Sequence, residues 1–496
     1  MTTAHEPPVP VPPLPPGPPP LPRTPRRGLP AAIGVALVLP AAFGIGQVLF
    51  WTAPEITSPL PWMRVFLLPE PDAFKLTRTF LYAGWALAAL LGALLLAGRR
   101  KATAPARVVR ALQAGILAAL LVPFAVMSLD VLRRAPLTLL LCLPTTGAAL
   151  LCVHRMQLFR RMPGRLLLAG FGWGMVFGAG FGTVMITWFT RYAPGYLLDW
   201  QHPRDAIRTL YTLFALNAGI VAELGKAAGV AVLFLLFRRH IDGVVSGVVL
   251  GAAVGLGFNL TETVGFMSTI EHGQQSAQFW IRQVVGLMAA HVAFTAVAGA
   301  GFGAARRLPE LRDRLLVVGG GVLAAAGGHF ATDSVMPQLG KMREELFGHD
   351  QTLGLLLGMP LITAVTSGPF VAVYAVVLRR GLKAQAAGLA EALRAEVASG
   401  AGAVTAPEAD LLLAPRRRLL LELRVWRRDG TAGLRHLLRL HQAQLDLATQ
   451  RWHRTGPGAD SCIPDEGPLR TRVLALKHLP AAPAGPALPT AQEALS

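Results

Sequence analysis

The sequence is poor in charge and in cysteine for a chain of 496 residues. Only 15% of its residues are charged, against about a quarter in ordinary soluble proteins, whereas 53% are hydrophobic. Its three cysteines, Cys142, Cys152 and Cys462, supply no disulfide framework, and we interpret them as unpaired. A P-loop, an HExxH motif and a dinucleotide-binding fingerprint are also missing. These deficits favour an integral membrane protein over a soluble enzyme of those classes.

Long apolar stretches predict an all-α fold, a polytopic transmembrane helix bundle of about ten spans. Residues 1–28 are dominated by proline and are expected to form a disordered cytoplasmic arm. We expect a transmembrane domain over residues 29–378 and a cytoplasmic tail over 379–496 that is partly helical and then disordered. The ten stretches are residues 29–51, 79–97, 111–129, 136–153, 166–190, 209–237, 243–268, 283–304, 315–332 and 352–378.

The positive charge of the chain is distributed unevenly between the two sides of the predicted bundle. The formal net charge of +19 alone would suggest nucleic acid as a partner. With the N-terminus inside, however, the inner connections carry 21 Lys and Arg residues and the outer connections carry 11, which eleven acidic residues offset. This asymmetry follows the positive-inside rule. It predicts a multi-pass protein of the cell membrane with cytoplasmic N- and C-termini and no nucleic-acid partner.

The tail contains one strongly periodic segment. The run from Leu419 to Trp452 has helical apolar spacing that is interrupted near Gly430 and Gly433. Three interpretations stay open for it: a helical hairpin, a helix that lies on anionic lipid, and a segment that binds a partner. The last thirty or so residues are rich in proline and alanine, and we expect them to be disordered.

Five ionisable side chains lie inside the sixth to ninth predicted spans. A charge at mid-bilayer costs roughly 2.5–3.5 kcal/mol, so such residues usually face a protein interior or a water-filled cavity. Two carboxylates, two imidazoles and an amine in consecutive spans therefore predict one polar site within the membrane. Such a set suits a hydrolytic site that binds Zn²⁺ or activates water directly, and it equally suits a proton relay. The five residues are Glu223, Lys226, Glu262, His291 and His329.

Helical spacing gives these residues an orientation. Glu223 and Lys226 lie three apart on one helical face, where they can act as a site or simply as an ion pair that locks helix packing. Glu262 falls near the face of a glycine stripe that permits close helix contact in lipid, so we expect this glutamate to point into the bundle. The stripe consists of Gly243, Gly247, Gly251 and Gly255.

The order of the motifs resembles the PrsW family of intramembrane proteases, part of a wider group with the CAAX-processing and bacteriocin-immunity membrane proteases. Over about residues 210–335 the chain has AELGK, a glycine-spaced run that ends in FNLTE, HVAFT followed by a glycine, and a late histidine. The corresponding family motifs are EExxK, FxxxEN and HxxxTxxxG, followed by a further histidine. Ala222 and Thr263 stand where the family has Glu and Asn. The matching positions are Glu223, Lys226, Phe258, Glu262, His291, Thr295, Gly299 and His329.

The resemblance implies an endopeptidase that cleaves membrane-anchored proteins near the outer face, with a single-span protein such as an anti-sigma factor as substrate. In this interpretation Glu223 is the base or water-orienting carboxylate, and Lys226 is its charge partner. Glu262 and His291 bind water or a metal, and His329 is a ligand or an oxyanion stabiliser. The expected ligands of Zn²⁺ are therefore Glu262, His291 and His329.

Two other classes of protein remain as alternatives. Because Ala222 removes one carboxylate of the family's first motif and Thr263 alters the second, a non-catalytic scaffold that binds single-span proteins is the second hypothesis. A proton-coupled transporter is the third. The chain shows no internal inverted repeat, and its intramembrane polar residues cluster in one half, which argues against a transporter.

Overall fold

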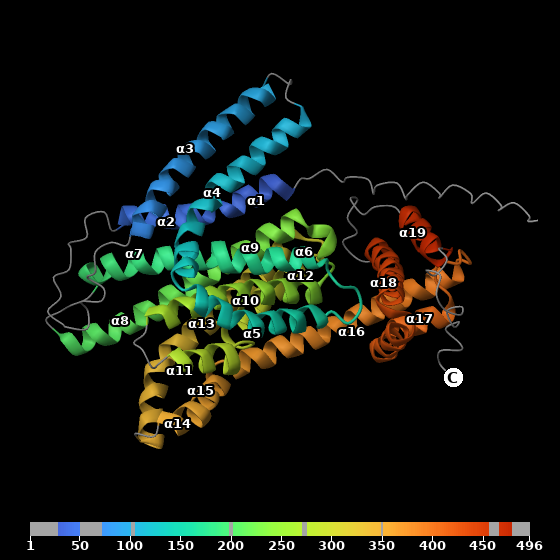
Figure 1. Cartoon of the computed structure of the whole chain (residues 1–496). Coiled ribbons are helices and arrows are strands. Elements are labelled where there is room, and N and C mark those ends of the chain that lie inside the picture. Colours follow the sequence, from blue (N-terminus) through green and yellow to red (C-terminus); the bar gives the residue numbers. More distant parts are fainter. Residues whose placement is uncertain are drawn as a thin grey trace, which may run out of the picture. The chain divides into compact units, whose positions relative to one another are not determined.

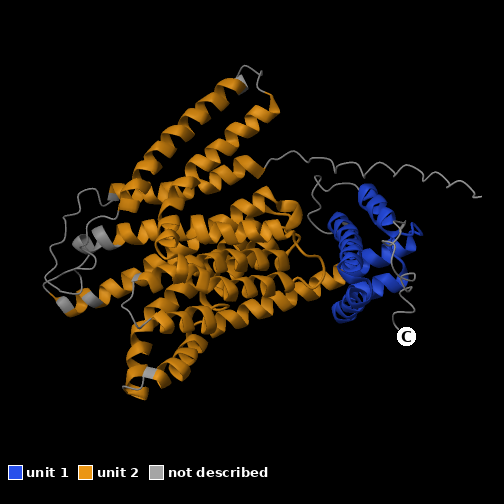
Figure 2. Cartoon of the chain, in the orientation of Figure 1, with its two compact units in different colours: residues 1–24, 389–454, 461–496 blue, residues 25–388, 455–460 orange. Residues whose placement is uncertain are grey.

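The structure is a computed structural model that describes residues 28–49, 72–100, 105–197, 202–269, 275–348, 351–455 and 466–478. The predicted proline-rich arm lies outside these ranges except for Gly28, and so does Cys462. The described chain is helical without strands, which confirms the all-α prediction. It divides into a membrane unit within residues 25–388 and a tail unit whose described residues lie within 389–454 and 461–496 (Figure 2).

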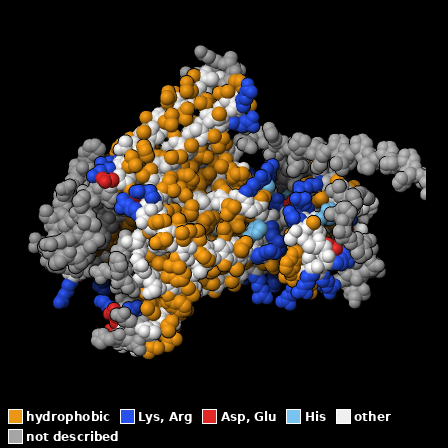
Figure 3. Space-filling model, in the orientation of Figure 1, with side chains coloured by type: hydrophobic (Ala, Val, Ile, Leu, Met, Phe, Trp, Pro, Cys, Tyr) orange, Lys and Arg blue, Asp and Glu red, His pale blue; other side chains and the backbone are white. Residues whose placement is uncertain are grey.

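Nine helices of the described chain are long and apolar enough to cross a membrane, and a tenth results if one pair bent by 54° is counted as a single span. This agrees with the ten stretches predicted from the sequence. In lipid a helix satisfies all of its backbone hydrogen bonds internally, which is why apolar stretches of this length become helical. Figure 3 shows hydrophobic side chains over most of the visible face of the membrane unit, as contact with lipid requires.

The helices of the membrane unit vary widely in length. In chain order they are α1 (Gly28–Ala36), α2 (Val38–Leu49), α3 (Asp72–Arg100), α4 (Ala106–Arg134), α5 (Pro136–Arg155), α6 (Gly164–Gly172), α7 (Ala179–Leu197), α8 (Pro203–Asn217), α9 (Glu223–Leu236), α10 (Val244–Thr269), α11 (Gln275–Phe279), α12 (Ala290–Ala305), α13 (Leu311–Phe347), α14 (Gln351–Leu353), α15 (Met359–Thr366) and α16 (Gly368–Ala398). Only one residue separates α1 from α2, α4 from α5, and α15 from α16.

Helix α10 is the centre of the membrane unit. Its most apolar window is 94% buried, whereas the corresponding window of α13 is 22% buried. Helices α9 and α12 pack against it, and α13 packs against α12 and α9 (Figure 1). These four helices correspond to the sixth to ninth predicted spans. The polar residues of those spans therefore enter the best-packed part of the bundle.

The glycine stripe of the seventh span is the contact surface between α10 and α12. A Cβ atom added at Gly247, Gly251 or Gly255 would lie under 3.0 Å from a backbone oxygen of α12. Gly299 and Gly303 of α12 present the same close approach to α10. Because any larger residue would separate the helices, the stripe sets their distance. The prediction of close packing along this face is confirmed.

Replacing Gly251 by leucine is expected to destabilise the membrane unit by about 3 kcal/mol or more, because the side chain would overlap the Thr295 carbonyl oxygen. Gly147→Leu in α5 is the matched control, since a Cβ there meets nothing within 4 Å. Thermal unfolding and the yield of monodisperse protein measure the difference. Equal behaviour of the two variants would show that α10 and α12 do not depend on close contact at Gly251.

π-Helical turns interrupt four of the spans, and such turns are frequent at functional sites. One ends directly before Glu223, and another contains Arg282. Beyond the latter turn the eighth span breaks, and α12 begins at Ala290 with a φ of 34°, which residues with a Cβ rarely adopt. His291 follows in the first turn of α12, inside the span. The four turns are Trp173–Gly178, Ala218–Ala222, Trp280–Val285 and Gly354–Gly358.

The tail unit contains α17 (Ala406–Leu413), α18 (Pro415–Thr455) and α19 (Gly467–His478). Helix α18 is kinked at Gly430, whose φ is 67°, which confirms the predicted interruption near this glycine. Gly433, in contrast, continues the helix. A kink between two long helical halves corresponds to the hairpin alternative for this run.

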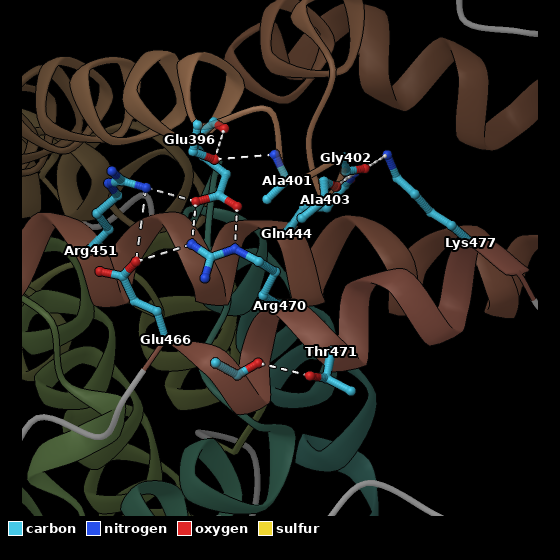
Figure 4. A network of polar contacts seen from close by, with 12 residues as sticks. Glu396, Ala401, Gly402, Ala403, Gln444, Arg451, Glu466, Arg470, Thr471 and Lys477 are labelled. Atoms are coloured by element: carbon cyan, nitrogen blue, oxygen red, sulfur yellow. Dashed lines mark hydrogen bonds and ion pairs between the residues drawn. The ribbon is translucent and has the colours of Figure 1, made fainter. Parts of the chain in front are cut away.

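Helix α19 (Gly467–His478) corrects the expectation of disorder for the first part of the last thirty or so residues, and residues 479–496 lie outside the described ranges. Leu469 and Val473 of α19 are buried with Leu447 of α18. Arg470 also donates two hydrogen bonds of 2.7 and 2.8 Å to Glu396, which accepts a third, of 2.7 Å, from Arg451 (Figure 4). The contacts of Glu396 join segments more than fifty residues apart, so local composition did not indicate the helix.

Candidate intramembrane site

The structure brings the five ionisable residues of the predicted site into one hydrogen-bonded group. Glu223 and Lys226 lie on α9, Glu262 on α10, His291 on α12 and His329 on α13. Four of them are buried, and Lys226 is fully so. Glu262 is the exception, with 27% of its side chain exposed. Four spans therefore contribute to a single polar centre.

Glu223 is the most heavily bonded carboxylate of the group. Its Oε1 accepts a hydrogen bond from Lys226 Nζ and lies 3.1 Å from His329 Nδ1. Its Oε2 accepts a bond of 3.3 Å from the Thr295 hydroxyl. A buried carboxylate is stable only with such partners. Glu223 thereby joins α9 to α12 and α13, and the ion pair with Lys226 has the i, i+3 spacing expected from the sequence.

His291 lies between a carboxylate and an amine. Its Nε2 is 2.7 Å from Glu262 Oε2, and its Nδ1 is 3.1 Å from Lys226 Nζ. Because a carboxylate only accepts, Nε2 carries the proton and the lone pair of Nδ1 faces Lys226. Arg282 donates a 2.7 Å bond to the same Glu262 oxygen. Glu262 and Arg282 therefore set the tautomer and the orientation of His291.

His329 has a comparable environment. Its Nδ1 faces Glu223, and its Nε2 lies 3.4 Å from Asp333 Oδ2, one helical turn further along α13. The Phe294 ring stacks on the imidazole, with 5.6 Å between the ring centroids. The rings of His291 and His329 meet edge to face at 4.9 Å. Each histidine therefore has a carboxylate near the nitrogen that points away from the centre of the group.

Three of the site residues could together bind a metal ion. Ligand atoms of Glu223, His291 and His329 all lie within 4.8 Å of one another. One carboxylate and two imidazoles form a donor set found in catalytic zinc sites. The trio differs from the sequence expectation, because Glu223 takes the place of Glu262. Glu262 instead lies behind His291, on the nitrogen opposite the centre.

The sequence patterns predict no role for Arg282 or Asp333. Asp333 follows His329 by four residues, so the helical period was an available signal for their proximity. Arg282 contacts Glu262 from within a π-helical turn, and its ring-face contact with Phe266, 3.9 Å to the centroid, also depends on that geometry. No periodic pattern predicts such a turn.

The two departures from the family motifs are both buried. Ala222 is 6% exposed and lies in an apolar cluster with Ala179 and Phe258. The Thr263 hydroxyl is fully buried and has no hydrogen-bond partner among the described residues. Ala222 thus leaves Glu223 without a carboxylate at the preceding position. The Phe258 ring contacts the other charged residue of the pair, with 4.2 Å between its centroid and Lys226 Nζ.

A buried carboxylate–histidine centre between apolar spans suits a membrane-embedded hydrolase, and the comparison with known families supports this class of protein. Residues 162–365 match the family model described as PrsW family intramembrane metalloprotease. This match agrees with the resemblance that the motif order predicted, and the matched part of the chain contains all five site residues. The metal in the family's name is consistent with the Glu–His–His group. No curated protein and no solved structure matches the chain.

Proposed function

We propose that the protein is an intramembrane endopeptidase that hydrolyses single-span membrane proteins at the group formed by Glu223, His291 and His329. The observation that carries this proposal is the convergence of these three donors, from three helices, inside the segment that matches the protease family. Anti-sigma factors are the substrate class that the resemblance implies. The excess of Lys and Arg on one side of the spans supports a cell-membrane protein with both termini in the cytoplasm.

Zn²⁺ is the metal that the donor set suits best. Glu223, His291 and His329 would hold it, since carboxylate and imidazole are ligands that Zn²⁺ prefers. Carboxylates behind both imidazoles, Glu262 and Asp333, match the outer contacts that orient histidine ligands in metal sites. Bound there, Zn²⁺ would supply Lewis-acid polarisation of the peptide carbonyl and a readily deprotonated water.

The residues of the chain itself supply positioning and proton transfer. In a reaction without a metal, the Glu223 carboxylate would orient the attacking water and accept its proton, whereas as a metal ligand it would position the metal. The Thr295 hydroxyl holds its second carboxylate oxygen in either case. Glu262 and Arg282 keep His291 in one tautomer. Burial of these groups excludes bulk water and strengthens each electrostatic contact within the site.

A non-catalytic scaffold is the second candidate, and Ala222 favours it. This alanine packs against apolar side chains and lacks the carboxylate that the family's first motif has at this position. A scaffold would retain the helix arrangement and bind single-span proteins without cleaving them.

The experiment that separates the two candidates uses full-length protein reconstituted with a panel of labelled single-span proteins. An endopeptidase is expected to cleave at least one of them, to contain metal by mass spectrometry, and to lose activity reversibly with a membrane-permeable chelator. Binding without cleavage by metal-loaded protein would contradict the proposal and support the scaffold. Cleavage that is insensitive to the chelator and occurs in metal-free protein would show that the reaction needs no Zn²⁺.

A further inference from the structure

The first half of α18 exposes a row of large apolar side chains. Leu419, Leu420, Leu423 and Trp426 are 48%, 56%, 40% and 48% exposed. No other large apolar side chain in the described part of the tail unit is as exposed. Leu419, Leu423 and Trp426 recur at i, i+4 and i+7, which places them on one face of the helix.

The opposite face of the same helical segment is buried within the tail unit. Arg418, Glu422 and Val425 are only 4%, 6% and 3% exposed. Arg418 and Glu422 form an ion pair with 3.7 Å between Nε and Oε1. The segment therefore has a defined inside and outside. The apolar row is a fixed outer surface of a folded unit and does not result from unfolding of the helix.

Arginines border the apolar row. Residues 415–428 contain six arginines and a single acidic residue, the inward-facing Glu422. Arg416, Arg417 and Arg427 are exposed on the outside. Leucine and tryptophan beside arginine form the pattern of helices that lie in the headgroup region of a bilayer, where tryptophan is enriched.

We propose that this face of α18, comprising Leu419, Leu420, Leu423, Trp426 and their flanking arginines, docks on the anionic surface of the bilayer that holds the membrane unit. Charge complementarity selects this occupant, because an anionic headgroup layer satisfies the arginines while the apolar row enters the acyl boundary. The chain runs without interruption through α16 (Gly368–Ala398) into the tail unit, so the bilayer is present at high effective concentration.

The fold of the tail unit keeps this face available. Glu396 binds Arg451 and Arg470 (Figure 4). Lys477 also donates a 2.7 Å hydrogen bond to Glu408, and these contacts together hold α19 against the rest of the unit. The kink at Gly430 separates the exposed half of α18 from the half that packs with α19. Docking therefore requires no unfolding, and its strength depends on the charge of the lipid.

The test uses the full chain with its three cysteines replaced by alanine and a single environment-sensitive fluorophore on Leu423→Cys. It is reconstituted as single copies in nanodiscs of phosphatidylcholine, alone or mixed with phosphatidylglycerol. We expect quenching by brominated lipid only in the anionic discs, and weaker quenching at high salt. The same fluorophore on Arg472→Cys of α19, which is exposed elsewhere on the unit, should remain unquenched.

Charge reversal at Arg416, Arg417 and Arg427 should abolish the quenching. Each arginine near an anionic surface strengthens binding roughly fivefold, so the loss is expected to exceed about a hundredfold. The matched control reverses the exposed Arg435, Arg439 and Arg472 and should retain it. Equal quenching in both lipids, or none in either, would overturn the proposal. Burial of the fluorophore that appears only when several copies share a membrane would assign the face to a second chain instead.

Discussion

Replacing Glu223 by glutamine is expected to lower the rate of substrate cleavage by a factor on the order of 10²–10⁴ while the protein still folds in the membrane. Glutamine retains the shape of the side chain and one oxygen acceptor, but it cannot take a proton from water. His291→Ala and His329→Ala should have losses of similar size and should also lower the metal content, because each removes one donor of the group. Metal analysis and initial cleavage rates measure the two effects.

The variants should not act independently of one another. Where residues work as a unit, removing one member costs nearly as much as removing several, so Glu223→Gln combined with His329→Ala should show little further loss. Glu262→Gln is expected to be milder, about 10- to 100-fold in metal affinity, because Glu262 acts on His291 from behind. Glu310→Gln and His436→Ala are matched controls outside the group. Multiplicative losses, or full activity of Glu223→Gln, would contradict the assignment.

Lys226→Met is expected to destabilise the metal-free protein by about 3–5 kcal/mol, because it leaves the buried Glu223 carboxylate without its cation. The Lys226 ammonium contacts Glu223 and His291, which are two of the three proposed metal ligands. An ammonium and a divalent cation therefore compete for the same atoms. Zn²⁺ or Co²⁺ should stabilise the methionine variant more than the parent, since binding to the folded state adds stability in proportion to affinity.

Thermal unfolding with and without metal, together with competition against a chromophoric chelator, measures both parts of this prediction. Lys341→Met, at an exposed position of α13, is the matched control and should leave stability and metal affinity unchanged. If metal stabilises the parent and Lys226→Met equally, the ammonium does not compete at the centre. If the variant is stable without metal, the Glu223–Lys226 pair is not needed to hold α9 in place.

The helical membrane-spanning architecture and the members of the polar group could be predicted from the amino-acid sequence. Spans of about twenty apolar residues are required by the thickness of a bilayer, so composition alone predicted ten of them. Charged residues at bilayer depth are unstable without partners, so Glu223, Lys226, Glu262, His291 and His329 had to meet. The glycine period likewise predicted which face of α10 makes close helix contact, because only glycine allows it.

The pairing of these residues, in contrast, depends on the packing of the helices against one another. Helical spacing assigns a side chain to a face but not to a neighbour on another helix. It therefore did not show that Glu223 joins the two histidines while Glu262 lies behind His291 with Arg282. The π-helical turn before Glu223 and the break before His291 rotate these side chains away from the positions that a regular helix would give.

The tail unit also combines one feature that the sequence predicts with one that depends on distant contacts. The kink at Gly430 was visible in the sequence, because glycine readily takes the positive φ that ends a helical run. Helix α19 was not visible, because Leu469, Val473 and Arg470 are stabilised by residues of α16 and α18 that are distant in the chain. Local composition reports what a segment can become alone, and only the folded chain supplies the partners that make it a helix.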